Sequence, residues 1–288
     1  MGGAPGTRDT ELLRPDCSVN QIDAIVLSGG SAFGLDAASG TQAWLREQGR
    51  GLLLDPVRVP IVPSAILFDL RNDGNKDWGK YPPYRDLGYA SAVRASSTVE
   101  LGCVGAAYGA ATANTPGGFG LASATCGHGH IIAAVALNAF GSPLVGDTRH
   151  YWAAPFELDS EFGGYGVAQP WPEDAKIGRT KSGQQIAGMN TTLAVIVTDF
   201  SLSTAQAQRI SIAAHDGFAR ALYPVHTPAD GDITFVASTG RHQLKPGDDL
   251  ELGVIAGNVT ARAIARAAHE AIQDDSGHAT STRPGLTA

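Results

Sequence analysis

The chain has 288 residues, of which 17% are charged, and its formal net charge is −7 without any basic block. This length allows one large domain or two modest ones, and the acidic balance argues against nucleic acid as a partner. No segment has the pattern of a signal peptide or reaches about 18 uninterrupted apolar residues, so we expect a soluble cytoplasmic protein without a membrane partner.

Cysteine and histidine positions give no sign of a metal centre. Cys17, Cys103 and Cys126 are odd in number and widely spaced, which fits neither a disulfide framework nor a zinc module. We expect reduced, mostly buried thiols. The histidines, His215 and His226 among them, lack a metal-ligand spacing and are interpreted as surface or satisfied core residues. Neither a metal nor a cofactor is expected.

A strand and a glycine-rich turn come first along the chain. The apolar run 23–28 predicts a strand, and the turn 29–34 leads into a helix over about 35–48. The turn is similar to a dinucleotide fingerprint but lacks its G-x-G start and a well placed acidic residue. Ser31 is not in a G-x-S-x-G elbow either. We therefore favour a tight turn whose backbone N–H groups line a pocket.

The middle of the chain alternates short apolar pieces with polar stretches. Residues 52–70 predict short extended pieces, residues 71–90 a polar surface excursion, and residues 130–137 a buried strand. Residues 147–185 show little pattern, and a connection of this length is uncommon inside a compact domain. We interpret it as an extended linker that delivers the chain to Asn190.

The last third has the clearest periodicity. Residues 192–198 predict a buried strand, after which Ser201 or Ser203 caps a helix to about Leu222. The pattern then predicts a turn at 228–232, a strand at 233–238, a helix at about 252–272 and a disordered tail at 274–288. Strands and helices that alternate without one fixed period suit helices layered over β-sheet.

The residues that open the strand, Asn190-Thr191-Thr192, carry a possible chemistry. If the Asn190–Thr191 peptide bond is cut, the Thr191 hydroxyl lies beside its own α-amine, so one residue holds both nucleophile and base. An α-amine has a pKa of about 7.7–8.0 and can accept a proton near neutral pH. Strand-leading threonines are also favoured by β-propensity alone, so both interpretations are open here.

Two further segments have a structural and a chemical interpretation. Asp230-Gly231-Asp232 lacks the remaining ligands of a calcium loop. It is either a simple turn or a pair of carboxylates that hydrogen-bond the ammonium or hydroxyl of Thr191. Asn138, at the end of a buried strand, is either a turn residue or an amide donor to an oxyanion.

As a set, these segments resemble the DmpA-type aminopeptidases of peptidase family S58, which include the endo-type nylon-oligomer hydrolases. The Asn-Thr pair, where other branches have Gly-Ser, is most similar to the nylon-oligomer (6-aminohexanoate) branch. The matching pieces are GGAPGTR at 2–8, AIVLSGGSAFGLD at 24–36, GGFG at 117–120, NAFG at 138–141, NTTL at 190–193, AHDG at 214–217, PVHT at 224–227 and DGD at 230–232.

The resemblance implies an αββα sandwich of the N-terminal-nucleophile type. It also implies autocleavage into an α chain of residues 1–190 and a β chain of residues 191–288, which stay together as one composite domain. The expected activity is hydrolysis of small peptides or linear oligoamides through an acyl-enzyme, by a homo-oligomer of αβ units.

The same resemblance assigns roles to individual residues. By similarity, Thr191 is the nucleophile and Asn138 assists the oxyanion. Supporting catalytic roles fall to Asp230 and Asp232. Substrate contacts fall to Gly117, Gly118 and Ser31.

Two departures from the family pattern leave alternatives open. Family members carry a further segment and strand ahead of the GGAPGTR motif, and many place a lysine directly before the Gly-Gly-x-Gly loop, where this chain has Pro116. The role of that lysine is therefore unfilled. The alternatives are a weak or inactive relative that binds amide-like ligands, and an oxidoreductase that binds a nucleotide at the turn 29–34. β-Amino-acid peptides, D-residue peptides and aminohexanoate oligomers are not distinguished as substrates.

Overall fold

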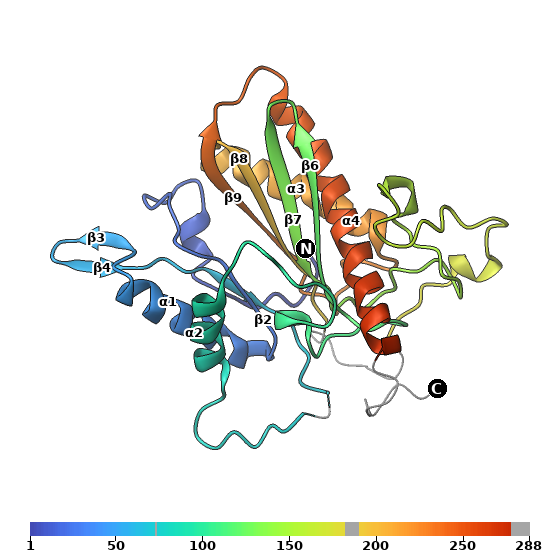
Figure 1. Ribbon diagram of the computed structural model, residues 1–288, viewed down its shortest axis with the longest axis horizontal. Helices are drawn as coiled ribbons and strands as arrows, with labels where there is room; N and C mark the ends of the chain where they lie inside the picture. The colour runs from blue at the N-terminus through green and yellow to red at the C-terminus, as the bar shows by residue number, and fades with distance from the viewer. Residues whose placement is uncertain (73, 182–189, 278–288) are drawn as a thin grey trace.

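The computed structural model describes residues 1–72, 74–181 and 190–277 (Figure 1). Its strands are β1 (Thr7–Arg8), β2 (Val26–Ser28), β3 (Leu52–Leu54), β4 (Val57–Val59), β5 (Ser64–Ile66), β6 (Phe119–Cys126), β7 (Gly129–Ala136), β8 (Leu193–Phe200) and β9 (Ile233–His242). Its α-helices are α1 (Ala37–Glu47), α2 (Tyr84–Arg94), α3 (Thr204–Ala221) and α4 (Asp248–Gly277).

The main sheet contains four strands in the order β6-β7-β8-β9. β6, β7 and β8 are antiparallel neighbours, whereas β8 and β9 run parallel, with Leu193 opposite Ile233. Successive side chains of β8 point to opposite faces: Leu193 packs in one hydrophobic cluster, and Ala194 and Ile196 in another. Both faces of the sheet are therefore buried, which explains the uninterrupted apolar run that predicted this strand.

Helices α3 and α4 cover one face of the main sheet (Figure 1). Phe218 of α3 and Ile264 of α4 are fully buried in the same hydrophobic cluster as Ile131 of β7. Gly118, directly before β6, allows α4 to approach closely, because a Cβ there would lie 2.1 Å from the carbonyl oxygen of Ala267. The close packing of α4 thus explains why residue 118 is a glycine.

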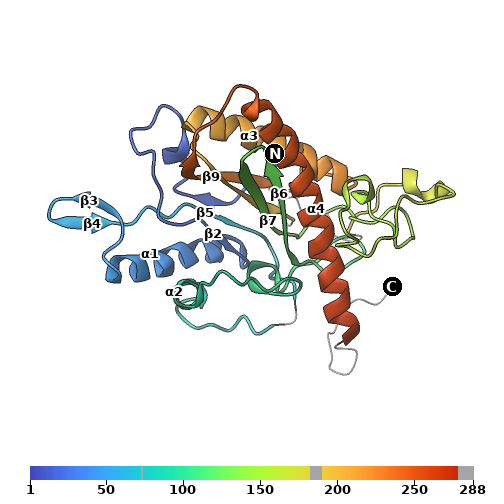
Figure 2. The same ribbon diagram turned by 45° about the horizontal axis from the view of Figure 1, so that its top comes forward.

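A second, three-stranded sheet packs on the other face of the main sheet (Figure 2). Its order is β1-β5-β2, with β2 parallel and β1 antiparallel to β5. Ala65 and Leu67 bring it into contact with Leu193 and Phe235 of the main sheet. Its outer face packs on α1 through the cluster around Ala38, and α2 lies beside α1. The αββα sandwich implied by the resemblance is confirmed.

Several local expectations are wrong. The stretch 71–90 includes the first turns of α2. Residues 119–126 form β6, a strand that was not expected beyond the glycine-rich loop. Its small side chains alternate weakly in hydropathy, so the strand is fixed mainly by pairing with β7 and by its contact with α4.

The connection after β7 is packed rather than extended. Tyr151 and Phe162 are buried in the main core, and their rings meet edge to face at 5.3 Å between centroids. The interpretation of this stretch as a mere linker is therefore wrong for its described part, and residues 182–185 lie outside the described residues. At the C-terminus, α4 continues to Gly277, so residues 274–277 are helical rather than disordered; the rest of the predicted tail lies outside the described residues.

Candidate functional site

The Asn190-Thr191-Thr192 segment lies inside the protein at the entrance to β8, and the side chains of all three residues are buried. The Thr191 hydroxyl donates a 2.6 Å hydrogen bond to the carbonyl oxygen of Asn190. The backbone N–H of Gly231 donates to the same oxygen at 2.9 Å. The nucleophile candidate and a backbone donor thus meet at one carbonyl group.

Gly231 has no room for a side chain. A Cβ there would lie 2.6 Å from Thr191 Oγ1 and 2.2 Å from the carbonyl oxygen of Ala4. The N-terminal motif GGAPGTR packs on the same turn, since the backbone N–H of Ala4 donates to the carbonyl oxygen of Asp230 at 2.9 Å. Gly2 has φ +85°, and a Cβ there would lie 2.4 Å from that oxygen, so both conformation and space favour glycine.

Asp230 and Asp232 flank Gly231 and are both buried. Asp232 accepts a hydrogen bond from the backbone N–H of Thr192 at 2.8 Å. Asp230 instead holds the surrounding loops, because its carboxylate accepts from the backbone N–H of Phe140 at 3.1 Å and from the Thr227 hydroxyl at 2.7 Å. Burial, reinforced by the neighbouring charge of Asp232, raises the pKa of Asp230. The two carboxylates thus differ in what they hold.

Asn138 follows β7 and contacts the reacting segment through its backbone. Its carbonyl oxygen accepts the backbone N–H of Thr191 at 3.0 Å. Its side-chain Oδ1 accepts from the backbone N–H of Ala111 at 3.1 Å, and its Nδ2 donates to the carbonyl oxygen of Phe68 at 2.9 Å. The sequence-predicted Asn138, Thr191, Asp230 and Asp232 are therefore brought together, although the oxygen of the Asn190 carbonyl receives its backbone donor from Gly231.

Lys181 also belongs to this cluster, and sequence reasoning missed it. Its ammonium donates to Asn138 Oδ1 at 3.1 Å, and its backbone N–H donates to the carbonyl oxygen of Phe140 at 3.2 Å. Burial lowers the pKa of Lys181 to about 7, and the charge of Asp230 offsets this only in part. No motif or spacing marks this lysine, because it lies in the patternless connection before Asn190.

Two histidines extend the site beyond Asp232. His226 Nδ1 lies 2.7 Å from Asp232 Oδ2, and its backbone has the uncommon φ of +52°. The His226 ring lies edge to face with His215 at 5.0 Å between centroids. Burial, with smaller contributions from the N-terminal ammonium and His226, lowers the pKa of His215 to about 3. The prediction of plain surface or core histidines missed the contact of His226 with the Asp232 carboxylate.

The predicted substrate contacts lie near the site and have their own packing roles. Gly117 donates its N–H to the carbonyl oxygen of Ala110, and the carbonyl oxygen of Gly118 accepts from Leu137 at 2.8 Å. The backbone N–H of Ser31 donates to the carbonyl oxygen of Leu67 at 3.0 Å, one residue before the Phe68 carbonyl that holds Asn138. Their contact with substrate remains a prediction.

Two backbone donors of the turn 29–34 already have partners within the protein. The N–H of Gly30 donates to Asp69 Oδ1 at 2.7 Å, and that of Ser31 is also occupied. Burial raises the pKa of Asp69. Its carboxylate occupies the space next to Gly29, where a Cβ would lie 2.6 Å from Asp69 Oδ2. An anionic group in this position disfavours the nucleotide alternative.

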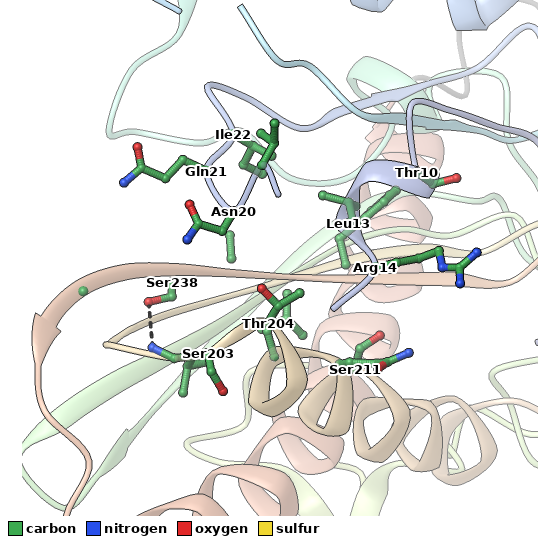
Figure 3. A pocket seen from close by; sticks show the side chains of 18 of the residues that line it. Thr10, Leu13, Arg14, Asn20, Gln21, Ile22, Ser203, Thr204, Ser211 and Ser238 are labelled. Carbon is green, nitrogen blue, oxygen red and sulfur yellow. Dashed lines mark hydrogen bonds between the residues drawn. The ribbon is translucent and has the colours of Figure 1, made fainter. Parts of the chain in front are cut away.

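A cavity of about 720 Å³ lies away from the Thr191 cluster, along β9 (Figure 3). We call it the β9 groove; it is lined by the N-terminal segment 10–22, by residues 202–211 around the start of α3, and by residues 234–240. Its side chains are mostly hydroxyl, amide and small apolar groups, and Arg14 is its one charged lining residue. None of the predicted site residues lines it.

The described residues contain no group of three or more His, Cys, Asp or Glu side chains arranged to hold a metal ion. None of the helices in the described ranges combines the length and the apolar character needed to cross a membrane. All three cysteines are free thiols; Cys126 is buried, Cys103 is partly buried, and Cys17 is exposed.

A buried threonine that opens an inner strand of an αββα sandwich, next to paired carboxylates, defines the class of N-terminal-nucleophile hydrolase folds. Solved structures agree on the fold. A Burkholderia β-aminopeptidase superposes with a TM-score of 0.61 and 19% identity, over 92% of this chain and 71% of its own. The L-aminopeptidase D-Ala-esterase/amidase of Ochrobactrum anthropi, described as a variant of the Ntn hydrolase fold, gives 0.56 and 19%, over 83% and 64%.

The chain belongs to peptidase family S58, whose family model matches residues 1–283. An uncharacterized aminopeptidase of Mycobacterium tuberculosis is 42% identical over 248 residues, which are 85% of this chain and 70% of the relative. The chain is therefore a hydrolase of the aminopeptidase type, with the Ntn fold.

Proposed function

We propose that this chain cuts its own Asn190–Thr191 bond and then hydrolyses small peptides or linear oligoamides with the Thr191 hydroxyl as nucleophile. The observation that carries the proposal is the geometry at one carbonyl group. Thr191 Oγ1 and the Gly231 N–H lie 2.6 Å and 2.9 Å from the Asn190 oxygen. The hydroxyl thus lies against the group that it would attack, and a donor already faces the oxygen that would become negative.

The first step converts the peptide bond into an ester. Thr191 Oγ1 attacks the Asn190 carbonyl carbon and loses its proton. The Gly231 N–H stabilises the resulting oxyanion, and a backbone donor of this kind is worth about 10²–10³ in rate. The C–N bond then breaks, the nitrogen takes up the proton that Oγ1 lost and leaves as the neutral α-amine of Thr191, and Asn190 remains joined to Oγ1.

Water completes the cleavage. It attacks the ester carbonyl carbon, the C–O bond breaks, and the products are an Asn190 carboxylate and a free Thr191 hydroxyl. The new α-amine occupies the place of the former amide nitrogen, where the Asn138 carbonyl oxygen already accepts its N–H at 3.0 Å. Asp232 keeps the start of β8 in register by accepting the Thr192 N–H at 2.8 Å.

The mature enzyme repeats the same chemistry on a substrate amide. The neutral α-amine accepts the Thr191 hydroxyl proton as Oγ1 attacks the substrate carbonyl carbon. The substrate amine takes up that proton and leaves, which forms an acyl-enzyme, and water then hydrolyses the acyl-enzyme. Gly231 and Asn138 supply the oxyanion donors, and the paired carboxylates orient the Thr191 amine. Peptides with β-amino-acid or D-residues and aminohexanoate oligomers are the substrate classes to screen, and we expect the αβ units to assemble as homo-oligomers in the cytoplasm.

The test is the intact mass of purified protein followed by an amide-substrate screen. Two fragments are expected, and the smaller should begin at Thr191. A preparation that stays one unbroken chain after long incubation and yet hydrolyses amides would overturn the proposal. An unbroken chain without amidase activity would instead support a ligand-binding relative.

A further inference from the structure

Lys181 differs from the other lysine of its segment. Its ammonium lies against Asn138 Oδ1 at 3.1 Å, whereas Lys176, five residues earlier in the chain, is exposed to solvent. Removing an ammonium from water is costly unless it gains a partner, so a lysine held beside the reacting segment has a defined role there. The proposed function as stated above does not use this residue.

The hydrogen bonds around Asn138 fix which way its amide points. The backbone N–H of Ala111 can only donate, so it identifies the acceptor Oδ1, and the Phe68 carbonyl can only accept, so it identifies the donor Nδ2. Lys181 adds a second, charged donor to Oδ1. Nδ2 carries two hydrogens, and Phe68 accepts one of them, so the amide has a second N–H to donate.

We propose that Lys181 is the positioning residue of the site, which holds and polarises the Asn138 amide so that its remaining N–H can stabilise the oxyanion. This inference rests on the proposed function. A charged donor on the amide oxygen strengthens the amide N–H as a donor through polarisation of the hydrogen-bond chain.

The charge of Lys181 changes near neutral pH. Burial lowers the pKa of Lys181 to about 7, and Asp230, whose charge opposes this shift, is the carboxylate that acts on it. Asp232 and His226 lie farther along the same turn. In the uncut chain the Thr191 nitrogen is still an amide, so the pH profile of self-cleavage lacks the titration of the mature nucleophile's amine; the N-terminal ammonium of Met1, which donates to the Asp232 carbonyl oxygen at 2.8 Å, is present in every variant compared. We expect the rate to fall as pH rises through about 7.

Kinetics of self-cleavage provide the first test. The rate of self-cleavage is measured by intact mass on freshly made full-length chain between pH 6 and 9. Four chains are compared: wild type, Lys181→Met, Lys181→Arg and the control Lys176→Met. Lys181→Met should cleave about 10²-fold more slowly. Lys181→Arg should recover part of the rate and lose the pH dependence, and Lys176→Met should match wild type. A Lys181→Met rate and pH profile equal to wild type would overturn the inference.

A second measurement does not depend on activity and separates this inference from the proposed function. The Thr191→Ala chain is labelled with ¹⁵N-asparagine, and NMR follows the side-chain amide resonance of Asn138 as the pH is changed. The resonance is assigned by its loss in the Asn138→Asp variant. The resonance should shift with a midpoint near pH 7. The Lys181→Met substitution should remove this shift, whereas a shift caused by the other nearby groups would remain. A resonance that does not move, or moves identically in both chains, would refute the contact. If wild type neither cleaves itself nor hydrolyses alanine p-nitroanilide, the proposed function fails, and this titration still decides the role of Lys181 at Asn138.

Discussion

The Thr191 cluster and the β9 groove lie along the same parallel strand pair, yet they differ in every property that matters for chemistry. The cluster is nearly closed, and its hydroxyl, carboxylates and amide are buried and hydrogen-bonded. The groove is a cavity of about 720 Å³ whose polar side chains are mostly neutral and solvated. The β9 groove therefore offers a large cavity, but its side chains are less suited to catalysis than those of the Thr191 cluster.

Desolvation explains the difference. In the cluster, burial raises the pKa of Asp230 and lowers that of Lys181 to about 7, so the charge of Lys181 responds to small changes around neutral pH. In the groove, Arg14 is the one charged lining residue. The Thr234 hydroxyl there lies 3.2 Å from His215 Nε2, but burial lowers the pKa of that histidine to about 3, which makes it a weak base. The site that we propose for the reaction therefore does not coincide with this cavity.

The largest effect should come from removing the nucleophile. Thr191→Ala should lower self-cleavage and amide hydrolysis by about four orders of magnitude or more, because no other group provides the attacking oxygen. The groove control Thr239→Ala should process normally. Denaturing electrophoresis and intact mass distinguish the two variants. If both variants behave alike, the comparison between cluster and groove fails.

Gly231→Ala should come next. The added methyl group would lie 2.6 Å from Thr191 Oγ1 and 2.2 Å from the Ala4 carbonyl oxygen. Either the Thr191 hydroxyl or the turn that contains Gly231 must therefore move. We expect self-cleavage to slow by about 10²–10³, as when an oxyanion donor is lost. Gly240→Ala, near the far end of β9, is the matched control, since a Cβ there meets nothing within 4 Å. Because Gly240 has φ +71°, its Ala variant tests strain alone. Rates from intact mass that are equal in both variants would contradict the proposed geometry.

Asp232→Asn should reduce the rate of the mature enzyme while the fold persists. The change keeps the shape but removes the charge that faces the Thr192 N–H at 2.8 Å and His226 Nδ1 at 2.7 Å. We expect a loss of about 10² in kcat, measured on an amide that the wild type hydrolyses. Asp174→Asn, at the partly buried ion pair with Arg179, is the control. An unchanged kcat in Asp232→Asn would exclude the carboxylate from the reaction.

Stability against pH should show the burial of Lys181. The folded chain releases the Lys181 proton near pH 7, whereas an unfolded lysine keeps it to about 10.5. The unfolded state therefore binds more protons between these values, and the free energy of unfolding should rise with pH there. Urea unfolding of the uncleaved Thr191→Ala chain should show this rise, and adding Lys181→Met should flatten it. An equal slope in both chains would mean that Lys181 is solvated.

The smallest effect should come from the groove. Ser203 accepts the Gln206 N–H and forms a capping box at the start of α3. Ser203→Ala should lower the free energy of unfolding by about 1 kcal/mol and leave self-cleavage unchanged. Urea unfolding of the same chain measures the first, and intact mass the second. A processing defect in this variant would show that the groove takes part in the reaction.

Local patterns were sufficient for a good part of this molecule. The apolar run before Phe200 predicts β8, and the Ser203 cap predicts α3, because burial on both faces and a capped amphipathic stripe leave clear marks in a sequence. The same reasoning missed α2 and β6. The apolar side chains of α2 are spread around the helix rather than gathered in a stripe, and β6 is built from small residues, so neither element has a strong period.

The sequence by itself determined the identities at the scissile pair and at the Asp-Gly-Asp turn, since hydroxyl, carboxylate and glycine must be encoded at those positions. Only the tertiary structure decided that Gly231 faces the Asn190 carbonyl and that Lys181 reaches Asn138. The reason is physical: these contacts join segments far apart along the chain, and they form only when two sheets pack and bury the groups between them. Burial then determines which proton each group keeps, and no local pattern encodes that.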